Sequence, residues 1–519
     1  MESGLISALQ TPECYPHPVS DIRLIETHIS WVLLTGDYVY KIKKPLDLGF
    51  LDFRELSARR HYCEEELRLN RRLAEPVYEA VVPITGSPES PAINGDGTPI
   101  DYAVRMRQFD PEQTLDRLSE RNELTPEQLD ELAERVASFH DSVPSLPPDS
   151  PMANTDDLRD AMVDNVTTAL EHLQEAGDRQ QAQALLEWIR DTFEQQRERL
   201  QQRLADGRIR ECHGDLHLGN IALFQGRITV FDCIEFNPEF RWIDTANDLA
   251  FLLMDLESRG HPAWSARVLN HYLEHSGDYE ALPLLRLFSA YRAMVRAKIA
   301  LLSPADSSEA EQQNLDRYRR YAELAERYSM IPQPWLAATT GFSASGKSRF
   351  SSALAEQFSM IRLRSDVERK RLFGLGPTES SNSAQDAGIY TQDATRQTYQ
   401  RLQALAHRAL ATGYPVIVDS AALHQKERDG LSEIAESLGV PFVLIACEAP
   451  ESVLRERIRE RARRSGEVSE ADEAVLDQQL GSADPIGESE RSHTIHVHTH
   501  TPGALEALIR ALDPGPRGH

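Results

Sequence analysis

The stretch Gly341-Phe342-Ser343-Ala344-Ser345-Gly346-Lys347-Ser348 decides the fold of the second half of this 519-residue chain. It follows the pattern G-x-x-x-x-G-K-[ST], whose glycines let backbone N–H groups surround phosphate oxygens at a helix N-terminus. The sequence predicts a strand before this loop and a helix after it, which is the context that such a loop requires. An ordinary glycine–serine turn is the alternative. We predict that the loop binds ATP, with Ser348 on Mg²⁺ and contacts from Gly341, Ser343, Ala344, Ser345, Gly346, Lys347, Ser348 and Arg349.

Apolar runs at 416–419 and 442–446 predict further buried strands, and helical stretches separate them. This alternation is typical of a parallel α/β sheet. Asp419 ends the first of these runs, where a carboxylate can act on Mg²⁺ through a water molecule. We therefore predict Asp419 as a metal ligand.

Charged residues beyond the loop predict the acceptor side of this second site. Asp366 ends a predicted strand and Arg369 lies one helical turn later, a D-x-x-R spacing that resembles P-loop kinases such as polynucleotide kinase. Asp366 is a candidate catalytic base, with a helix N-cap as the alternative, and Arg369 is a candidate acceptor contact. Six arginines between 455 and 464 look like a lid helix, with Arg457 and Arg461 as candidate contacts. An exposed, salt-bridged helix is the alternative for that run.

A second phosphate-handling pattern, His-Gly-Asp-Leu-His-Leu-Gly-Asn, lies in the first half at 213–220. Asp215 and Asn220 have the spacing of the kinase catalytic loop H-R-D-x-x-x-x-N, and Asp232 ends the next predicted hairpin. Phosphoryl transfer needs mainly positioning, metal ions and one group that orients the acceptor hydroxyl. By itself, the segment could equally be a polar turn.

Upstream residues add a strand lysine and a helix glutamate to this pattern. Lys41 lies on a predicted strand and Glu66 on the helix predicted next, like the paired lysine and glutamate of a kinase N-lobe. Lys41 could instead be one of three solvated lysines, and Glu64 and Glu65 are rivals of Glu66. Only seven of the 56 basic residues are lysine, which favours a functional role for the lysine on this strand.

Through these motifs, residues 20 to about 300 resemble the aminoglycoside phosphotransferase family of small-molecule kinases. The resemblance implies an α+β protein-kinase-like domain in which Asp215 is the catalytic base and Asn220 and Asp232 bind Mg²⁺. It also implies that 106–109 form the hinge that meets adenine and that Asp248 is a structural anchor.

Two features of the first half bear on its substrate. Cys233-Ile-Glu-Phe departs from the family pattern after the metal aspartate, which concerns the antibiotic substrate more than the kinase chemistry. A protein kinase is the rival interpretation, but only fifteen residues separate Asp232 from Asp248, too few for an activation segment. Small hydroxylated acceptors fit better.

Residues 335–513 resemble the zeta-toxin and gluconate-kinase-like group of P-loop kinases, which are AAA-type ATP-binding proteins. Many bacterial proteins with this order are called bifunctional aminoglycoside phosphotransferase/ATP-binding proteins. We expect a kinase-like domain at 1–330, a linker at 331–334, an α/β P-loop domain at 335–513 and a tail at 514–519. Each domain is expected to have its own core and to fold separately.

Composition excludes several other classes of protein. The net charge of −26 disfavours a nucleic-acid polymer as partner, because phosphate neutralisation supplies most non-specific affinity for nucleic acids. No apolar run approaches the roughly 18 residues of a membrane span, so no membrane partner is expected. Five scattered cysteines without C-x-x-C spacing predict reduced thiols in the cytoplasm.

We expect an ATP- and Mg²⁺-dependent fusion in which each half transfers a γ-phosphoryl group to a small hydroxylated molecule. One alternative is that the P-loop half binds and hydrolyses ATP only to regulate the kinase-like half. Another is a scaffold without turnover, against which the intact Asp215, Asn220, Asp232 and Lys347 count.

Overall fold

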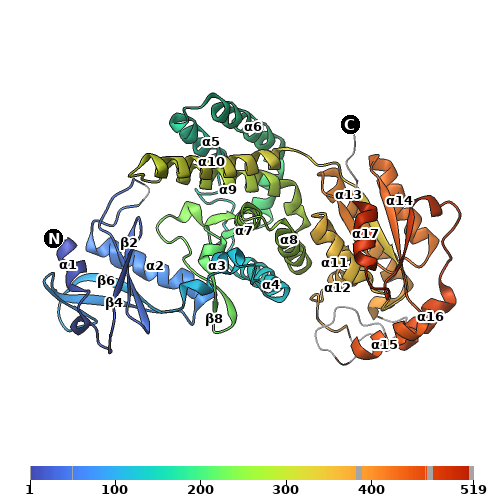
Figure 1. Cartoon of the computed structure of the whole chain (residues 1–519), viewed down its shortest axis with the longest axis horizontal. Helices are drawn as coiled ribbons and strands as arrows, with labels where there is room; N and C mark the ends of the chain where they lie inside the picture. The colour runs from blue at the N-terminus through green and yellow to red at the C-terminus, as the bar shows by residue number, and fades with distance from the viewer. Residues whose placement is uncertain (1, 50, 382–387, 462, 464–471, 514–519) are drawn as a thin grey trace.

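The computed structural model describes residues 2–49, 51–381, 388–461, 463 and 472–513, and the predicted tail at 514–519 lies outside these residues. The chain forms two bodies side by side, with the first half on the left of Figure 1 and the second on the right. The chain passes from one to the other between α10, which ends at Ser329, and β11, which begins at Leu336.

An antiparallel sheet opens the first half, with its six strands in the order β1-β2-β3-β6-β4-β5. Tyr40 and Ile42 of β3 lie in an apolar core on one face of the sheet. Because side chains alternate along a strand, Lys41 and Lys43 lie on the other face, the one that α2 covers. The elements are α1 (Glu2–Ala8), β1 (Arg23–Glu26), β2 (Ser30–Leu34), β3 (Tyr38–Lys43), α2 (Leu56–Ala74), β4 (Tyr78–Ser87), β5 (Ser90–Ile93) and β6 (Pro99–Arg107).

Helices dominate the rest of the first half and surround α7, most of whose residues are buried. Two short antiparallel ribbons, β7 with β10 and β8 with β9, hold the loops that carry the site residues. The elements are α3 (Leu115–Glu120), α4 (Pro126–Ser142), α5 (Thr155–His172), α6 (Ala176–Ala205), β7 (Ile209–Glu211), β8 (Ile221–Phe224), β9 (Arg227–Val230), β10 (Trp242–Asp244), α7 (Thr245–Ser258), α8 (Pro262–Ser276), α9 (Leu282–Leu302) and α10 (Ser308–Ser329).

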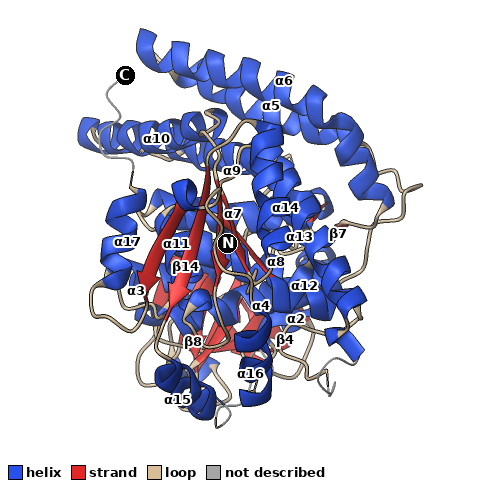
Figure 2. Cartoon of the chain, turned by 90° about the vertical axis from the view of Figure 1, so that its right-hand side faces the viewer, coloured by secondary structure: helices blue, strands red, loops and turns tan. Residues whose placement is uncertain are grey.

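A parallel sheet in the order β12-β13-β11-β14-β15 forms the centre of the second half (Figure 2). One face packs against α11 and α17, and the other against α13 and α14. The elements are β11 (Leu336–Thr340), α11 (Lys347–Gln357), β12 (Ile361–Arg364), α12 (Ser365–Leu372), α13 (Gln392–Ala411), β13 (Val416–Asp419), α14 (Gln425–Leu438), β14 (Phe442–Glu448), α15 (Glu451–Arg461), α16 (Glu473–Ser482), β15 (Thr494–His498) and α17 (Ala504–Leu512).

The predicted fold class, an α+β kinase-like half followed by an α/β half with a parallel sheet, is confirmed by these two sheets. None of the helices that the structure describes combines the length and the apolar character needed to cross a bilayer.

The two halves share a core that the sequence did not predict, although each half also has an apolar cluster of its own. One apolar cluster runs from α7, α8 and α9 of the first half to β11, β12 and α13 of the second. Helix α8 packs against α11 and β12, and in Figure 1 it lies where the two bodies meet. The physical reason is that β12 is an edge strand, and an edge strand leaves backbone groups that need a partner.

Asn270 of α8 supplies that partner. Its Nδ2 donates to the carbonyl of Met360 at 2.9 Å, and its Oδ1 accepts from the backbone N–H of Arg362 at 2.7 Å. All four groups are shielded from water at the junction of the halves, since the asparagine side chain is 3% exposed. Buried backbone groups without partners are costly, so this one side chain ties the edge of the second sheet to the first half.

We predict that Asn270→Ala lowers the free energy of unfolding by about 1–3 kcal/mol, because it leaves the Arg362 N–H and the Met360 carbonyl buried and unpaired. Chemical denaturation of the full chain measures this loss. The expected result is one transition in which both halves lose structure together. Asn314→Ala, a buried asparagine within the first half, is the matched control for a local defect. Two separate transitions, only one of them sensitive to Asn270→Ala, would restore the expectation of independent cores.

Candidate functional site

Asp248 of α7 fixes the loop 213–220 of the first half in place through hydrogen bonds to its backbone. The two carboxylate oxygens of Asp248 accept from the backbone N–H groups of His213 and Gly214, at 3.0 and 2.9 Å. His140 lies 3.1 Å from the same carboxylate. Burial opposes the charge on Asp248, but the hydrogen bond from His140 and the nearby histidines hold its pKa at about 2. The loop therefore rests on a permanent, buried negative charge.

Gly214 allows the loop to pass close to a second segment of chain. Its φ of +87° is in the left-handed region, and a Cβ here would lie 2.5 Å from the carbonyl oxygen of Phe240. A side chain at this position would push the next residue, Asp215, out of place.

Asp215 and Asn220 come together as the sequence predicts. The Asn220 side-chain Nδ2 donates to the backbone carbonyl and to the carboxylate of Asp215, both at 3.0 Å. His217 Nε2 lies 3.4 Å from the same carboxylate. Burial opposes ionisation of Asp215, but the charge of His217 outweighs it and holds the pKa of the carboxyl below its usual range. In turn, Asp215 raises the pKa of His217 against the effect of burial.

Lys41 links the sheet to α2 and to Asp232, the aspartate predicted to bind a metal ion. Its Nζ lies 2.9 Å from Glu66 Oε1 and 2.5 Å from Asp232 Oδ1. Burial opposes the charge of this lysine, yet Asp232 and Glu66 raise its pKa well above the ordinary value. The predicted pairing of Lys41 with Glu66 is the one found, while Glu64 and Glu65 bind arginines on the outer side of α2.

Two residues of this charge cluster were missed by sequence reasoning. Lys43, which was grouped with the solvated lysines, is fully buried and binds both Glu66 and Glu235. Glu235 belongs to the segment Cys233-Ile-Glu-Phe, where the chain departs from the family pattern. The signal available in the sequence was the spacing of Lys41 and Lys43, which places both side chains on one face of β3. Three carboxylates (Glu66, Asp232, Glu235) against two ammonium groups leave this cluster one charge negative, which favours a cation.

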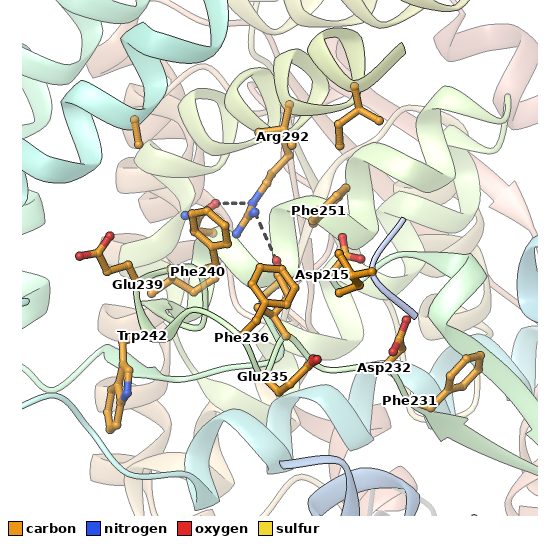
Figure 3. Close-up of a pocket in the computed structure, with 18 of the residues that line it drawn as sticks. Asp215, Phe231, Asp232, Glu235, Phe236, Glu239, Phe240, Trp242, Phe251 and Arg292 are labelled. Atoms are coloured by element: carbon orange, nitrogen blue, oxygen red, sulfur yellow. Dashed lines mark hydrogen bonds between the residues drawn. The ribbon is translucent and has the colours of Figure 1, made fainter. Parts of the chain in front are cut away.

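A cavity of about 1280 Å³ opens onto these residues. Lys41, Asp215 and Asp232 line it, together with Met106, Arg107 and Phe109 from the predicted hinge. Figure 3 shows other residues that line it: Phe251 lies beside Asp215, Phe236, Phe240 and Trp242 extend the apolar lining away from the two aspartates, and Arg292 comes from α9. Arg292 is fixed in place because it donates to Asn247 at 2.8 Å and to the Gly214 carbonyl at 3.3 Å. The cavity therefore joins the hinge, the ionised Asp215 and an aromatic wall in one space.

The loop 341–348 connects β11 to α11, as predicted. Gly341 has a φ of +144°, and a Cβ there would lie 2.4 Å from the carbonyl oxygen of Cys447, so glycine is required. Lys347 Nζ donates to the carbonyls of Gly341 and Phe342, at 2.8 and 2.7 Å. Burial lowers the pKa of Lys347, and the carboxylates of Asp419 and Asp366 counteract this effect. The predicted residues Lys347, Asp419 and Asp366 therefore lie within electrostatic reach of one another.

The helix N-cap alternative for Asp366 does not hold. Helix α12 begins at Ser365, its N-cap position is Arg364, and Asp366 is already inside the first turn. Arg369, one turn later, donates to the carbonyl of Ile389 at 3.1 Å and to Thr395 Oγ1 at 3.0 Å. That arginine thus also ties α12 to α13.

Some arginines of helix α15 lie near the phosphate-binding loop, as predicted for a lid helix, and others form ion pairs on the surface, as in the alternative interpretation. Arg457 donates to the carbonyl of Ala344 in the phosphate-binding loop at 3.1 Å, and Arg461 is close enough to lower the pKa of Lys347. Arg455 and Arg459 instead form ion pairs with Glu473 of α16 and its neighbours. Arg349 is exposed on α11, with its guanidinium 5.8 Å from the Phe350 ring centroid. The end of the run, beyond Arg463, lies outside the described residues.

Two family models match the chain, one in each half. Residues 32–285 match the phosphotransferase enzyme family, and residues 336–486 match the AAA domain. The first half carries a phosphotransferase domain, and the second an AAA domain. The chain is also similar to uncharacterized proteins of Mycobacterium tuberculosis and Mycobacterium bovis, each 29% identical over 455 residues that cover 86% of this chain and 89% of the relative. A match of this length cannot fit within either half, so the similarity runs across both.

Solved structures similar to part of this chain include the amicoumacin kinase hAmiN in complex with AMP-PNP, which is 14% identical over 63% of this chain and 93% of that chain, with a TM-score of 0.39. A gluconokinase from Sinorhizobium meliloti is similar to a part of this chain, 24% identical over 35% of it and 97% of that chain, with a TM-score of 0.25.

The residues of both domains fit a magnesium nucleotide. In the AAA domain, Asp419 Oδ2 and Ser345 Oγ are buried and have no hydrogen-bond partner among the described residues. A buried carboxylate oxygen without a partner is costly unless a ligand satisfies it, and Mg²⁺ prefers such oxygen ligands. In the phosphotransferase domain, the carboxylate of Asp232 faces the cavity and is 44% exposed, beside a cluster of net negative charge. Asp232 is held in the left-handed region, at a φ of +62°, a conformation that the surrounding structure must support.

The pair of His217 and Asp215 predicts a dependence of stability on pH. The folded-state pKa of His217 is raised, so its contribution is complete below the unfolded value of about 6.5 and is lost as the pH rises through the folded pKa. We expect His217→Gln to lower the free energy of unfolding more at pH 6 than at pH 9. Denaturant titrations at several pH values measure the difference. His172→Gln, which changes an exposed histidine of α5, should show no such trend, and an equal loss at both pH values would contradict the assignment.

Proposed function

We propose that the phosphotransferase domain transfers the γ-phosphoryl group of ATP to a hydroxyl group of a small molecule. The observation that carries this proposal is the ionised Asp215, which faces the same cavity as Lys41 and Asp232. A carboxylate at this position can accept the hydroxyl proton while the substrate is held for in-line attack. The free, buried state of all five cysteines supports a cytoplasmic location.

Each side chain of the first site has a role in this proposal. Lys41, oriented by Glu66, would hold the α- and β-phosphates, and Asn220 and Asp232 would bind Mg²⁺. When bound, magnesium ATP supplies the transferable phosphoryl group. Lys43 and Glu235 would keep Glu66 in place from behind. The aromatic wall around Asp215 supports a compact acceptor, and the short segment between Asp232 and Asp248 disfavours a peptide.

The AAA domain is proposed to be a second, P-loop phosphotransferase site. Lys347 would bind the β- and γ-phosphates, while Ser348 and Asp419 would hold Mg²⁺. Asp366 is proposed as the base for the acceptor hydroxyl, and Arg457 and Arg461 as lid residues at the phosphates. These roles are supported by two observations: the charges of Asp419, Asp366 and Arg461 act on Lys347, and Arg457 contacts the phosphate-binding loop.

Helix α8 favours a second candidate function, in which nucleotide at the AAA domain regulates the first site. Tyr272 on α8 contacts His140 at 2.9 Å, and His140 in turn contacts Asp248 under the catalytic loop. Glu274, two residues further along α8, binds arginines of β12. The two sites thus share one helix, but a shared helix is a route for coupling and not a measure of it.

We predict that Asp215→Ala lowers transfer at the first site by roughly 10²–10⁴-fold, the usual effect of removing a general base. Nucleotide binding should persist, because Lys41 and the metal ligands remain. The assay follows ATP consumption by the full chain against a panel of small alcohols and amino sugars, in a Lys347→Ala background that silences the second site. Unchanged turnover in the Asp215→Ala variant would show that Asp215 is not the general base.

The same assay separates the regulatory candidate from the independent one. If the AAA domain only regulates, Lys347→Ala in the otherwise native chain lowers transfer at the first site even though Asp215 is intact. If the two sites work independently, that variant leaves first-site transfer unchanged. Asn314→Ala again serves as the control for general destabilisation.

For the second site, we predict that Asp366→Asn keeps nucleotide affinity near that of the native chain and lowers transfer to an acceptor by roughly 10²–10⁴-fold. The reason is that in this proposal the carboxylate acts on the acceptor, while the loop and Asp419 would retain the nucleotide. Paired nucleotide titration and product analysis measure both quantities. A lower melting temperature with unchanged transfer would instead assign Asp366 a structural role.

A further inference from the structure

A buried carboxylate of the phosphotransferase domain reaches into the AAA domain. Glu274, near the end of α8, is 3% exposed and binds two arginines of β12. Its Oε1 accepts from Arg362 Nη2 at 2.6 Å, and its Oε2 accepts from Arg364 Nη1 at 3.1 Å. Burial opposes the charge on Glu274, but the two guanidinium groups hold its pKa at about 2. The carboxylate is thus ionised in the folded chain at any physiological pH.

Arg364 stands between this carboxylate and the metal aspartate of the second site. Its Nε forms only a long ion pair with Asp419 Oδ2, at 3.8 Å and beyond hydrogen-bond distance, and that oxygen has no hydrogen-bond partner among the described residues. Strands β12 and β13 are paired so that Arg364 and Asp419 are direct neighbours in the sheet. The guanidinium therefore lies between two carboxylates, hydrogen-bonded to Glu274 and only loosely paired with Asp419.

Asp419 can bind Mg²⁺ well only if its carboxylate is not tightly paired with a positively charged side chain of the protein. An arginine that closed the remaining gap would turn this long ion pair into a hydrogen-bonded one, and a metal ion would have to displace it. Glu274 offers Arg364 a competing anion on the opposite side. Because Glu274 belongs to the other half of the chain, the second site is complete only when the two halves are docked.

We propose that Glu274 is a positioning residue of the AAA-domain site, which keeps Arg364 off Asp419 and so leaves that carboxylate to magnesium nucleotide. This inference rests on the proposed nucleotide binding at the second site. The inference goes beyond the proposed function because it assigns Glu274, a residue of the phosphotransferase domain, to the nucleotide site of the AAA domain. Through this residue, docking of α8 onto β12 sets the magnesium requirement of the second site.

The test measures how much Mg²⁺ is needed for binding of a fluorescent ATP analogue to the full chain. Second-site binding is the part of the signal that Lys347→Ala removes. We expect Glu274→Gln to raise the Mg²⁺ midpoint of this part by roughly 5- to 150-fold, the usual range for coupling between sites. The Glu274→Gln/Arg364→Gln double variant should return the midpoint toward that of the native chain, since the competing cation is gone.

Arg362→Gln is the matched control, because it disrupts the same buried cluster and leaves Arg364 bound to Glu274. It should lower the melting temperature without moving the Mg²⁺ midpoint. Glu274→Asp provides a second variant that keeps the buried charge but shortens its reach, so a smaller shift in the same direction is expected even if Glu274→Gln folds poorly.

An unchanged midpoint in Glu274→Gln and Glu274→Asp, with Lys347-dependent binding intact, would overturn the inference and leave the proposed function standing. A shift that Arg362→Gln reproduces would also overturn it, because general loosening of the interface would then be the cause. A native chain without Lys347-dependent binding would overturn the proposed nucleotide site itself, and the inference with it.

Discussion

The contact between α8 and the edge of β12 is the constraint on which the arrangement of this protein depends. An exposed edge strand offers unpaired backbone groups, and here Asn270 satisfies two of them while Glu274 binds two arginines. Both side chains are buried in the docked halves, so separation would break these hydrogen bonds and expose the apolar surface around them to water. Two domains that could in principle be separate are thereby joined through one core.

The phosphotransferase domain relies on a different use of buried charge. Five ionisable groups, Lys41, Lys43, Glu66, Asp232 and Glu235, are packed between β3, α2 and the metal loop. Each member holds another in place, and only Asp232 is substantially open to the cavity. Such a network fixes Lys41 and Asp232 in place, which is the positioning that the proposed phosphoryl transfer requires.

Sequence reasoning succeeded where the chemistry is local. The loop 341–348 needs its glycines because of backbone geometry, and Asp215 and Asn220 are five residues apart on one turn, so both could be identified from spacing. It failed for Lys43 and Glu235, because neither belongs to a recognised motif and only the fold brings them together across 192 positions of the chain. Sequence reasoning also missed the core that the two halves share, since nothing in the pattern of α8 or β12 alone shows that these elements meet.

The sequence by itself predicted the two fold classes, which the structure confirms, and it singled out the phosphate-binding loop and Lys41, Glu66, Asp215, Asn220 and Asp232 as candidate site residues. Short-range spacing marked the loop and the pair Asp215 and Asn220, whereas Lys41, Glu66 and Asp232 were grouped with that pair through the resemblance to a kinase family. Only the tertiary structure decided that Glu274 faces Arg364, that Arg364 stops short of Asp419, and that one helix borders both sites. Those relations depend on which surfaces are buried against each other, and burial decides whether a charge is solvated or must find a partner.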